Sequence, residues 1–221
     1  MHTITLVSTR HDELGKCNSN ELYQIFEQID PDLIFEEIPP SFFGKYYVEK
    51  THHNLESKAI SKYSRTHKTA HIPVDLDSLP TESFFQDYKD MLQRIEGLTD
   101  INGFNYRTLT DSNTSYVGKY GFNYLNNTHC IKLNDEIQDA IVKGLEKIDN
   151  DQLSRTYNLW NENNNKREIE MLQNIYEYSA KHYYDRAIFT VGAGHRKSLI
   201  QKIYEYQRNT KLRLNWIFYT T

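Results

Sequence analysis

Four ionisable side chains each follow closely on a short β-type run of the sequence. They are two histidines and two carboxylates: His11, Glu37, Asp75 and His195. In an open parallel sheet, ligands bind outside the carboxyl ends of the strands, where residues far apart in the sequence meet. An isolated loop histidine or aspartate is more often a solvated or capping residue. Because four of them occupy equivalent positions, the sequence predicts one functional site.

Two imidazoles and a carboxylate suit two kinds of hydrolytic chemistry. His11, Glu37 and His195 could bind a divalent ion such as Mn, Co or Zn, which would lower the pKa of a bound water. Without a metal, Glu37 could act as general base on water while a histidine polarises the substrate or protonates the leaving group. The sequence leaves both options open. Glu36 would point away from Glu37 if the strand extends that far, so Glu37 is favoured for chemistry, and Glu36 and Asp75 are candidates for ligand binding.

A glycine-containing turn and an arginine complete the candidate site. Gly192 and Gly194 precede His195 and a predicted helix, so their backbone N–H groups could hold a phosphate, another anion or a reaction oxyanion. The turn lacks the third glycine of a dinucleotide-binding motif and the Gly-Lys-Ser/Thr of a P-loop. Arg167 could supply a fixed cation to a carboxylate or an anionic intermediate, or could be a surface charge paired with a neighbouring glutamate.

The spacing of apolar residues predicts the elements that position these side chains. Beta-type runs occupy residues 3–8, 32–35, 70–74, 186–191 and 212–219. Helical spacing occurs between them, over residues 21–29, 52–67, 166–182 and 196–206. This alternation predicts an α/β fold in which helices flank a central, largely parallel or mixed sheet. Pro73 places the third strand near an edge or a strand end, and the last strand is expected at an edge.

Residues 76–165 break the alternation and are predicted to form a helical or lid insertion within a single α/β domain, residues 1–221. Helical spacing near 82–96 and 134–148 flanks a segment at 102–128 that is rich in Gly, Asn and Tyr. The aromatic residues of this segment predict a packed lid: Tyr106, Tyr116, Tyr120, Phe122 and Tyr124. The Asn-rich stretch 161–165 is expected to precede a helix that begins at Lys166.

Composition limits the classes of function. The 221 residues carry a net charge of −4 and no basic cluster, so nucleic acid is not an expected partner. Cys17 and Cys130 form no CxxC pair, which fits a reducing compartment. The N-terminus is unlike a signal peptide and no run of about 18 apolar residues occurs, so we expect a cytoplasmic protein without a membrane partner. The sequence does not specify an oligomeric state.

The order of these motifs resembles that of a known group, the TraB/Tiki family within the broader set that includes ChaN and the erythromycin esterases. The family has G-x-x-H after the first strand, an acidic residue after the second, a late helical Arg and a second G-x-x-H. The corresponding residues here are Ser8-Thr9-Arg10-His11, Glu36-Glu37, Arg167 and Gly192-Ala193-Gly194-His195. Ser8 stands where the family usually has glycine. The resemblance implies a central mixed sheet with helices on both sides, a pocket formed by the motif residues, and hydrolase activity.

The resemblance leaves the substrate open, because Tiki proteins are described as metal-dependent proteases, erythromycin esterases as lactone hydrolases and TraB-type proteins as shutdown factors for peptide pheromones. The sequence therefore predicts a hydrolase of an ester, lactone or amide bond, acting on a small molecule or a peptide. In this hypothesis His11, Glu37 and His195 bind metal or activate water, and Arg167 stabilises negative charge. The alternative is a non-catalytic module that binds a peptide or a phosphorylated ligand in the same crevice.

Overall fold

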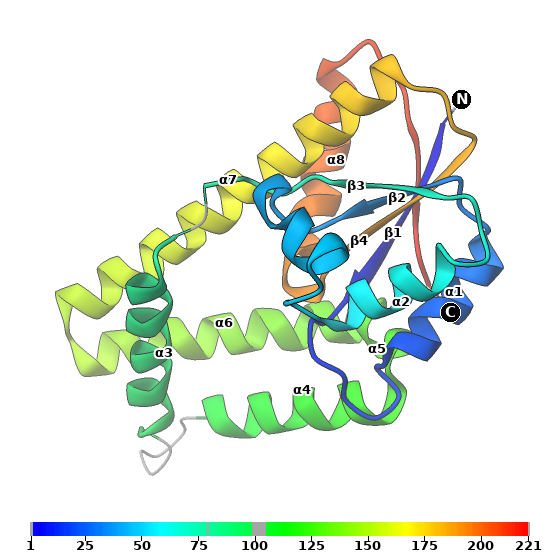
Figure 1. Cartoon of the computed structure of the whole chain (residues 1–221). Helices are drawn as coiled ribbons and strands as arrows, with labels where there is room; N and C mark the ends of the chain where they lie inside the picture. The colour runs from blue at the N-terminus through cyan, green and yellow to red at the C-terminus, as the bar shows by residue number, and fades with distance from the viewer. Residues whose placement is uncertain (1, 79, 99–104, 221) are drawn as a thin grey trace.

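A parallel sheet forms the centre of the protein, shown by a computed structural model that describes residues 2–78, 80–98 and 105–220 (Figure 1). Its strands are β1 (Thr3–Thr9), β2 (Leu33–Glu36), β3 (Ala70–Pro73), β4 (Arg186–Gly192) and β5 (Asn215–Phe218). Within the described residues the strand order is β3-β2-β4-β1-β5, and every pairing is parallel. The predicted α/β fold is confirmed, as are the edge positions of the third and last strands.

Helices connect the strands and cover both faces of the sheet (Figure 1). The helices are α1 (Ser19–Ile29), α2 (Leu55–Tyr63), α3 (Glu82–Glu96), α4 (Tyr106–Tyr120), α5 (Phe122–Leu125), α6 (Thr128–Ile148), α7 (Asp151–Lys181) and α8 (Arg196–Asn209). Three short segments are 3₁₀ or π-helical: Pro40–Phe42, Gly44–Val48 and Ala193–His195. None of the helices in the described ranges is long and apolar enough to cross a membrane.

Two hydrophobic cores follow from the alternation of side chains along the strands. Val7, Ile34 and Ile188 face α1, α2 and the helices that precede α7. Their strand neighbours, such as Leu6 and Phe35, face the second half of α7 and helix α8. Because successive strand residues point to opposite faces, each strand contributes to both cores. The carboxyl ends of the strands lie between the two layers.

The region 76–165 is helical in its described part, but its predicted end is wrong. Helix α7 begins at Asp151 and runs to Lys181 without a break, so the Asn-rich stretch 161–165 lies inside it. The helix begins early because the side chain of Asn150 accepts hydrogen bonds from the N–H groups of Gln152 and Leu153. Asparagine costs less than about 1 kcal/mol in a helix interior, which packing against neighbouring helices readily offsets.

The aromatic segment is packed into the protein, and its role as a lid stays a prediction. Tyr106, Phe122 and Tyr124 are buried in the core that the inserted helices share with α1 and α2. Asn126, which follows α5, joins this region to the sheet, because its side chain accepts from the N–H of Ser8 and donates to the carbonyl of Ser8. The inserted helices are thereby fixed beside the end of β1, and residues 102–104 of the predicted lid lie outside the described residues.

Candidate active site

The parallel sheet brings the predicted residues to one edge. His11 comes two residues after β1, Glu37 directly after β2, Asp75 two residues after β3, and His195 three residues after β4. Arg167 reaches the same place from the middle of α7. The convergence expected from the strand ends is therefore present.

Arg167 is held by two carboxylates. Its Nε and Nη2 atoms donate to both oxygens of Asp75 at 2.7–3.1 Å, and Nη2 also donates to Oε1 of Glu37 at 2.6 Å. The side chains of Asp75 and Glu37 are almost completely buried, and that of Arg167 is 16% exposed. Such a bidentate pair fixes the guanidinium plane. Arg167 is thus a positioned cation of the site, and Asp75 orients it; ligand binding by Asp75 stays a prediction.

Glu37 lies at the centre of the site. Its Oε2 accepts a hydrogen bond of 2.6 Å from the N–H of Gly192, and its Oε1 lies 3.4 Å from Nε2 of His195. Burial alone would raise the pKa of Glu37, but the positive charges of His195, His11 and Arg167 outweigh burial and hold this pKa well below its usual range. The surrounding positive charges therefore favour the ionised form of Glu37.

The glycine turn is shaped around this carboxylate. A Cβ atom at Gly192 would stand 3.3 Å from Oε2 of Glu37, so a larger residue would push against it. The N–H of Gly192 is already bonded to Glu37, which means that the turn holds an anion supplied by the chain itself. Gly194 has open space where its Cβ would be and lines the cleft. This arrangement leaves less room for a phosphate than the sequence suggested.

Each histidine of the site is paired with a carboxylate from a helix. Nδ1 of His195 lies 2.7 Å from Oε1 of Glu168 on α7, and Nδ1 of His11 lies 3.3 Å from Oε1 of Glu56 on α2. Thr9 donates a 2.5 Å hydrogen bond to the same oxygen of Glu56. A carboxylate on one ring nitrogen fixes the orientation of an imidazole and raises its basicity. The site thus contains two carboxylate–histidine pairs that line the same cleft as Glu37.

The two pairs raise the pKa of both histidines. For His11, the hydrogen bond with Glu56 is the largest cause and raises the pKa to about 9. For His195, burial opposes the proton, but the charge of Glu37 and the hydrogen bond with Glu168 raise the pKa to about 9. His195 contacts carboxylates through both nitrogens, as a protonated ring does. His11 differs, because its Nε2 has no partner among the described residues and its side chain is 56% exposed.

The carboxylates of these pairs were not predicted from the sequence, although a signal was present. Glu56 is spaced with Ala59, Ile60 and Tyr63 on the buried face of α2. Glu168 is spaced in the same way with the buried residues of α7 and is held by Ser198 and Lys202 at 2.5–2.8 Å. A glutamate on an apolar helix stripe must be paired inside the fold.

Glu36 does not belong to the cleft. Both of its oxygens accept hydrogen bonds of 2.6–2.7 Å from the hydroxyl of Tyr47, and Nε2 of His71 is 3.9 Å away. Burial raises the pKa of Glu36 to about 8 and lowers that of His71 to about 4. The prediction that Glu36 binds ligand is not supported by this position, which is internal. The alternation of strand side chains explains why it points away from Glu37.

Two of the three predicted metal ligands, Glu37 and His195, are engaged by other groups of the protein. Residues 2–78, 80–98 and 105–220 contain no group of three His, Cys, Asp or Glu residues arranged to hold one. Glu37 gives its oxygens to Arg167 and Gly192, and His195 gives Nδ1 to Glu168. Metal dependence therefore stays a prediction, and the chemistry proposed below has no metal step.

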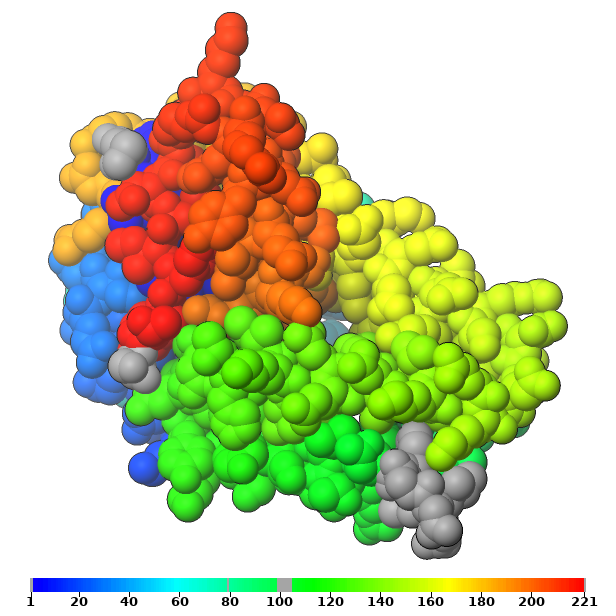
Figure 2. All heavy atoms as spheres, turned by 180° about the vertical axis from the view of Figure 1, so that it is seen from behind, coloured from blue at the N-terminus to red at the C-terminus, as the bar shows by residue number. Residues whose placement is uncertain are grey.

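A cleft of about 650 Å³ opens above these residues, between α6, α7 and the start of α8. His11, Glu37, Arg167, Gly192, Gly194 and His195 all line it. In Figure 2 the surface is recessed where the green atoms of α6 meet the orange atoms of α8 and the yellow-green atoms of α7. The volume falls in the range of small-molecule sites.

No protein-family model, curated protein or solved structure matches this chain.

Proposed function

We propose that the protein is a hydrolase of esters, lactones or amides that needs no metal ion. The observation that supports this most is the pair of carboxylate-bound histidines that line one cleft together with Glu37. Buried charges and strongly perturbed histidines cluster at catalytic sites far more often than elsewhere. The resemblance to the TraB/Tiki family, still a prediction, points to the same reaction class.

In the proposed reaction, His11 transfers the protons. Its neutral ring takes a proton from water through Nε2 while the water oxygen attacks the carbonyl carbon, and the π electron pair moves to the carbonyl oxygen. When that pair returns, the bond to the leaving oxygen or nitrogen breaks, and the leaving group takes the proton from His11. The products are a carboxylic acid and an alcohol or amine. Glu37 is a weak base here because its pKa is so low.

The other charged groups stabilise the negative charge that develops on the carbonyl oxygen. Among the described residues none accepts a hydrogen bond from Nη1 of Arg167, so this N–H is free to point at the substrate. Glu37 keeps His195 protonated and fixed, which adds a second positive charge beside the reacting atoms. Preorganised charges of this kind contribute most to the rate when water is excluded.

The test is a screen of nitrophenyl esters, lactones and aminoacyl amides with the wild type and with His11→Ala and His195→Ala. We expect turnover that both variants lose, while His53→Ala, an exposed histidine away from the cleft, keeps it. The rate should rise about tenfold from pH 7 to pH 8. Both pH values lie below the pKa of His11, and in this range the neutral fraction of the imidazole increases about tenfold per pH unit. The metal alternative is tested with EDTA and with added Mn, Co and Zn.

Loss of turnover in EDTA and its return with one ion would overturn the metal-free mechanism. A hydrolysis rate that does not change from pH 7 to pH 8 would assign the role of general base to Glu37 instead of His11. Turnover that survives both histidine substitutions would remove the cleft from the reaction altogether. Wild-type protein without turnover on any substrate class, but stabilised by phosphate, would support the non-catalytic binding module.

A further inference from the structure

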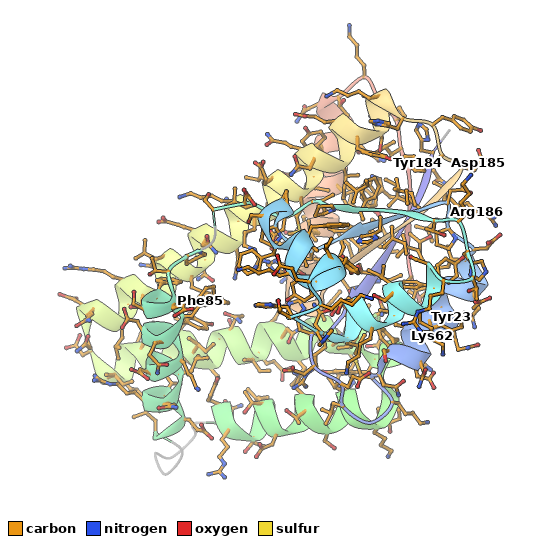
Figure 3. The ribbon with its side chains drawn as sticks, in the orientation of Figure 1. Tyr23, Lys62, Phe85, Tyr184, Asp185 and Arg186 are labelled. Carbon is orange, nitrogen blue, oxygen red and sulfur yellow. The ribbon has the colours of Figure 1, made fainter. Side chains whose placement is uncertain are left out.

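The cleft has a second half that the proposed chemistry does not use. Three aromatic side chains line it: Tyr88 from α3, and Tyr157 and Trp160 from α7. The rings of Tyr88 and Trp160 are stacked, with centroids 4.0 Å apart and planes 14° apart. Phe85 adds an edge contact to Trp160 at 6.2 Å and is labelled on α3, close to α7, in Figure 3. This part of the wall is a rigid aromatic stack.

Carboxamide side chains surround the aromatic stack. Five of them line the cleft, two from α6 and three from α7: Asn134, Gln138, Asn161, Asn164 and Asn165. Their spacing of three or four residues places each group on one face of its helix. The Oδ1 atom of Asn164 is buried and has no hydrogen-bond partner in the described part of the chain. The Oε1 of Gln138 already accepts a hydrogen bond of 3.0 Å from the hydroxyl of Tyr157. The other four carboxamides each carry a donor and an acceptor, so the wall suits a ligand rich in groups that do the same. We call this half of the cleft the amide end.

The amide end carries no net charge. Apart from the residues of the reaction centre, the charged side chains that line the cleft are Asp135 and Lys197. These two pair with each other at 2.8–2.9 Å, so their charges cancel. A phosphorylated or carboxylate-rich ligand would find no counter-charge there. The ligand that fits is neutral, hydrogen-bonding and flat enough on one side to lie on an aromatic ring.

We propose that the amide end binds a neutral sugar ring carried by the substrate. The hydroxyl groups of a pyranose are both donors and acceptors, which matches the carboxamides, and its C–H face packs on an aromatic ring. Trp160 and Arg167 are seven residues apart on α7, just under two turns, so both face the cleft with about 10 Å between them along the axis. The inference rests on the proposed function and specifies a sugar ring at about this distance from the reacting carbonyl.

Tryptophan fluorescence tests the proposal without turnover. The chain has two tryptophans, so Trp216→Phe leaves Trp160 in the cleft as the only source of tryptophan fluorescence. We expect methyl glucoside, methyl mannoside or N-acetylglucosamine to change its emission saturably at millimolar concentration. A neutral capped trialanine peptide and inorganic phosphate should not. In the same background, Asn161→Ala should weaken sugar binding at least tenfold, and Asn158→Ala, a matched change on α7 outside the cleft, should not.

If none of the sugars changes the emission saturably, the proposal is overturned. If only the peptide changes the emission, the ligand of the amide end is a peptide backbone and not a sugar. Equal effects of Asn161→Ala and Asn158→Ala overturn the assignment to this wall. Adding His11→Ala separates this inference from the proposed function. Sugar binding that persists in His11→Ala, which the proposed function expects to be inactive, supports the subsite independently of the reaction. Sugar binding by a wild-type protein that turns over no substrate supports the subsite and overturns the reaction. Hydrolysis without sugar binding overturns the subsite alone.

Discussion

Replacing Glu56 with glutamine should lower the pKa of His11 from about 9 to near its ordinary value of 6.5. The hydrogen bond with Glu56 is the largest cause of the raised pKa, and glutamine keeps the shape of the side chain without its charge. At pH 7 a histidine of pKa 9 is neutral in about 1% of molecules, and one of pKa 6.5 in most of them. The rising limb of the proposed pH–rate profile should therefore move to lower pH by about the same amount.

The assay is an NMR titration of the imidazole Cε1–H signals, with His11 assigned from His11→Ala. Glu13→Gln is the matched control, because Glu13 is an exposed carboxylate near His11 that pairs with Ser19 and Lys58 instead. We expect the His11 signal to titrate near 9 in the wild type and in the control, and near 6.5 in Glu56→Gln. A wild-type His11 that titrates near 6.5, or one that Glu56→Gln leaves unchanged, would refute the pairing and the role given to His11.

Two further predictions concern stability. The melting temperature should fall as pH rises from 6.5 to 9. The pKa values of His11 and His195 are higher in the folded protein than in the unfolded chain. The stability that their protonation adds below pH 6.5 is therefore lost as the pH passes through about 9. The raised pKa of Glu36 also lowers the melting temperature as pH rises to 8, so Glu36→Gln should reduce the dependence of melting temperature on pH. A melting temperature that rises from pH 6.5 to 9 contradicts the raised pKa values of these groups. Asp75→Asn should cost about 3 kcal/mol in urea unfolding, because it breaks a buried pair with Arg167. Asp30→Asn, which breaks an exposed pair, should cost under about 1 kcal/mol, and equal losses would contradict this view of Asp75.

The sequence predicted those parts of the protein that depend on local pattern. Beta-rich runs such as residues 186–191 predict the strands. The rule for parallel sheets then predicts that His11, Glu37 and His195 meet at one edge of the sheet, where the structure has them. Pro73 predicts a sheet edge or a strand end, because proline cannot donate to a strand ladder. Both hold, since β3 lies at the sheet edge and ends at Pro73.

The errors arose where contacts distant in sequence decide the structure. The start of α7 was misplaced because Asn150 caps it and because its first half is stabilised by α3, as the stack of Tyr88 on Trp160 shows. The partners of the histidines were missed because Glu56 and Glu168 lie 45 and 27 residues away in the chain. Ser8 is explained only by the fold, since its hydroxyl accepts a hydrogen bond from the buried Arg196.

The positions of the two histidine partners have a consequence for how the protein assembles. Glu56 belongs to α2, on one face of the sheet, and Glu168 belongs to α7, on the other. A partly folded chain that has completed only one layer would hold only one of the two pairs. The raised pKa values of both His11 and His195 therefore require that both helix layers are packed on the sheet. The proposed reaction needs both pairs, so we expect a chain that lacks either layer to be inactive rather than partly active.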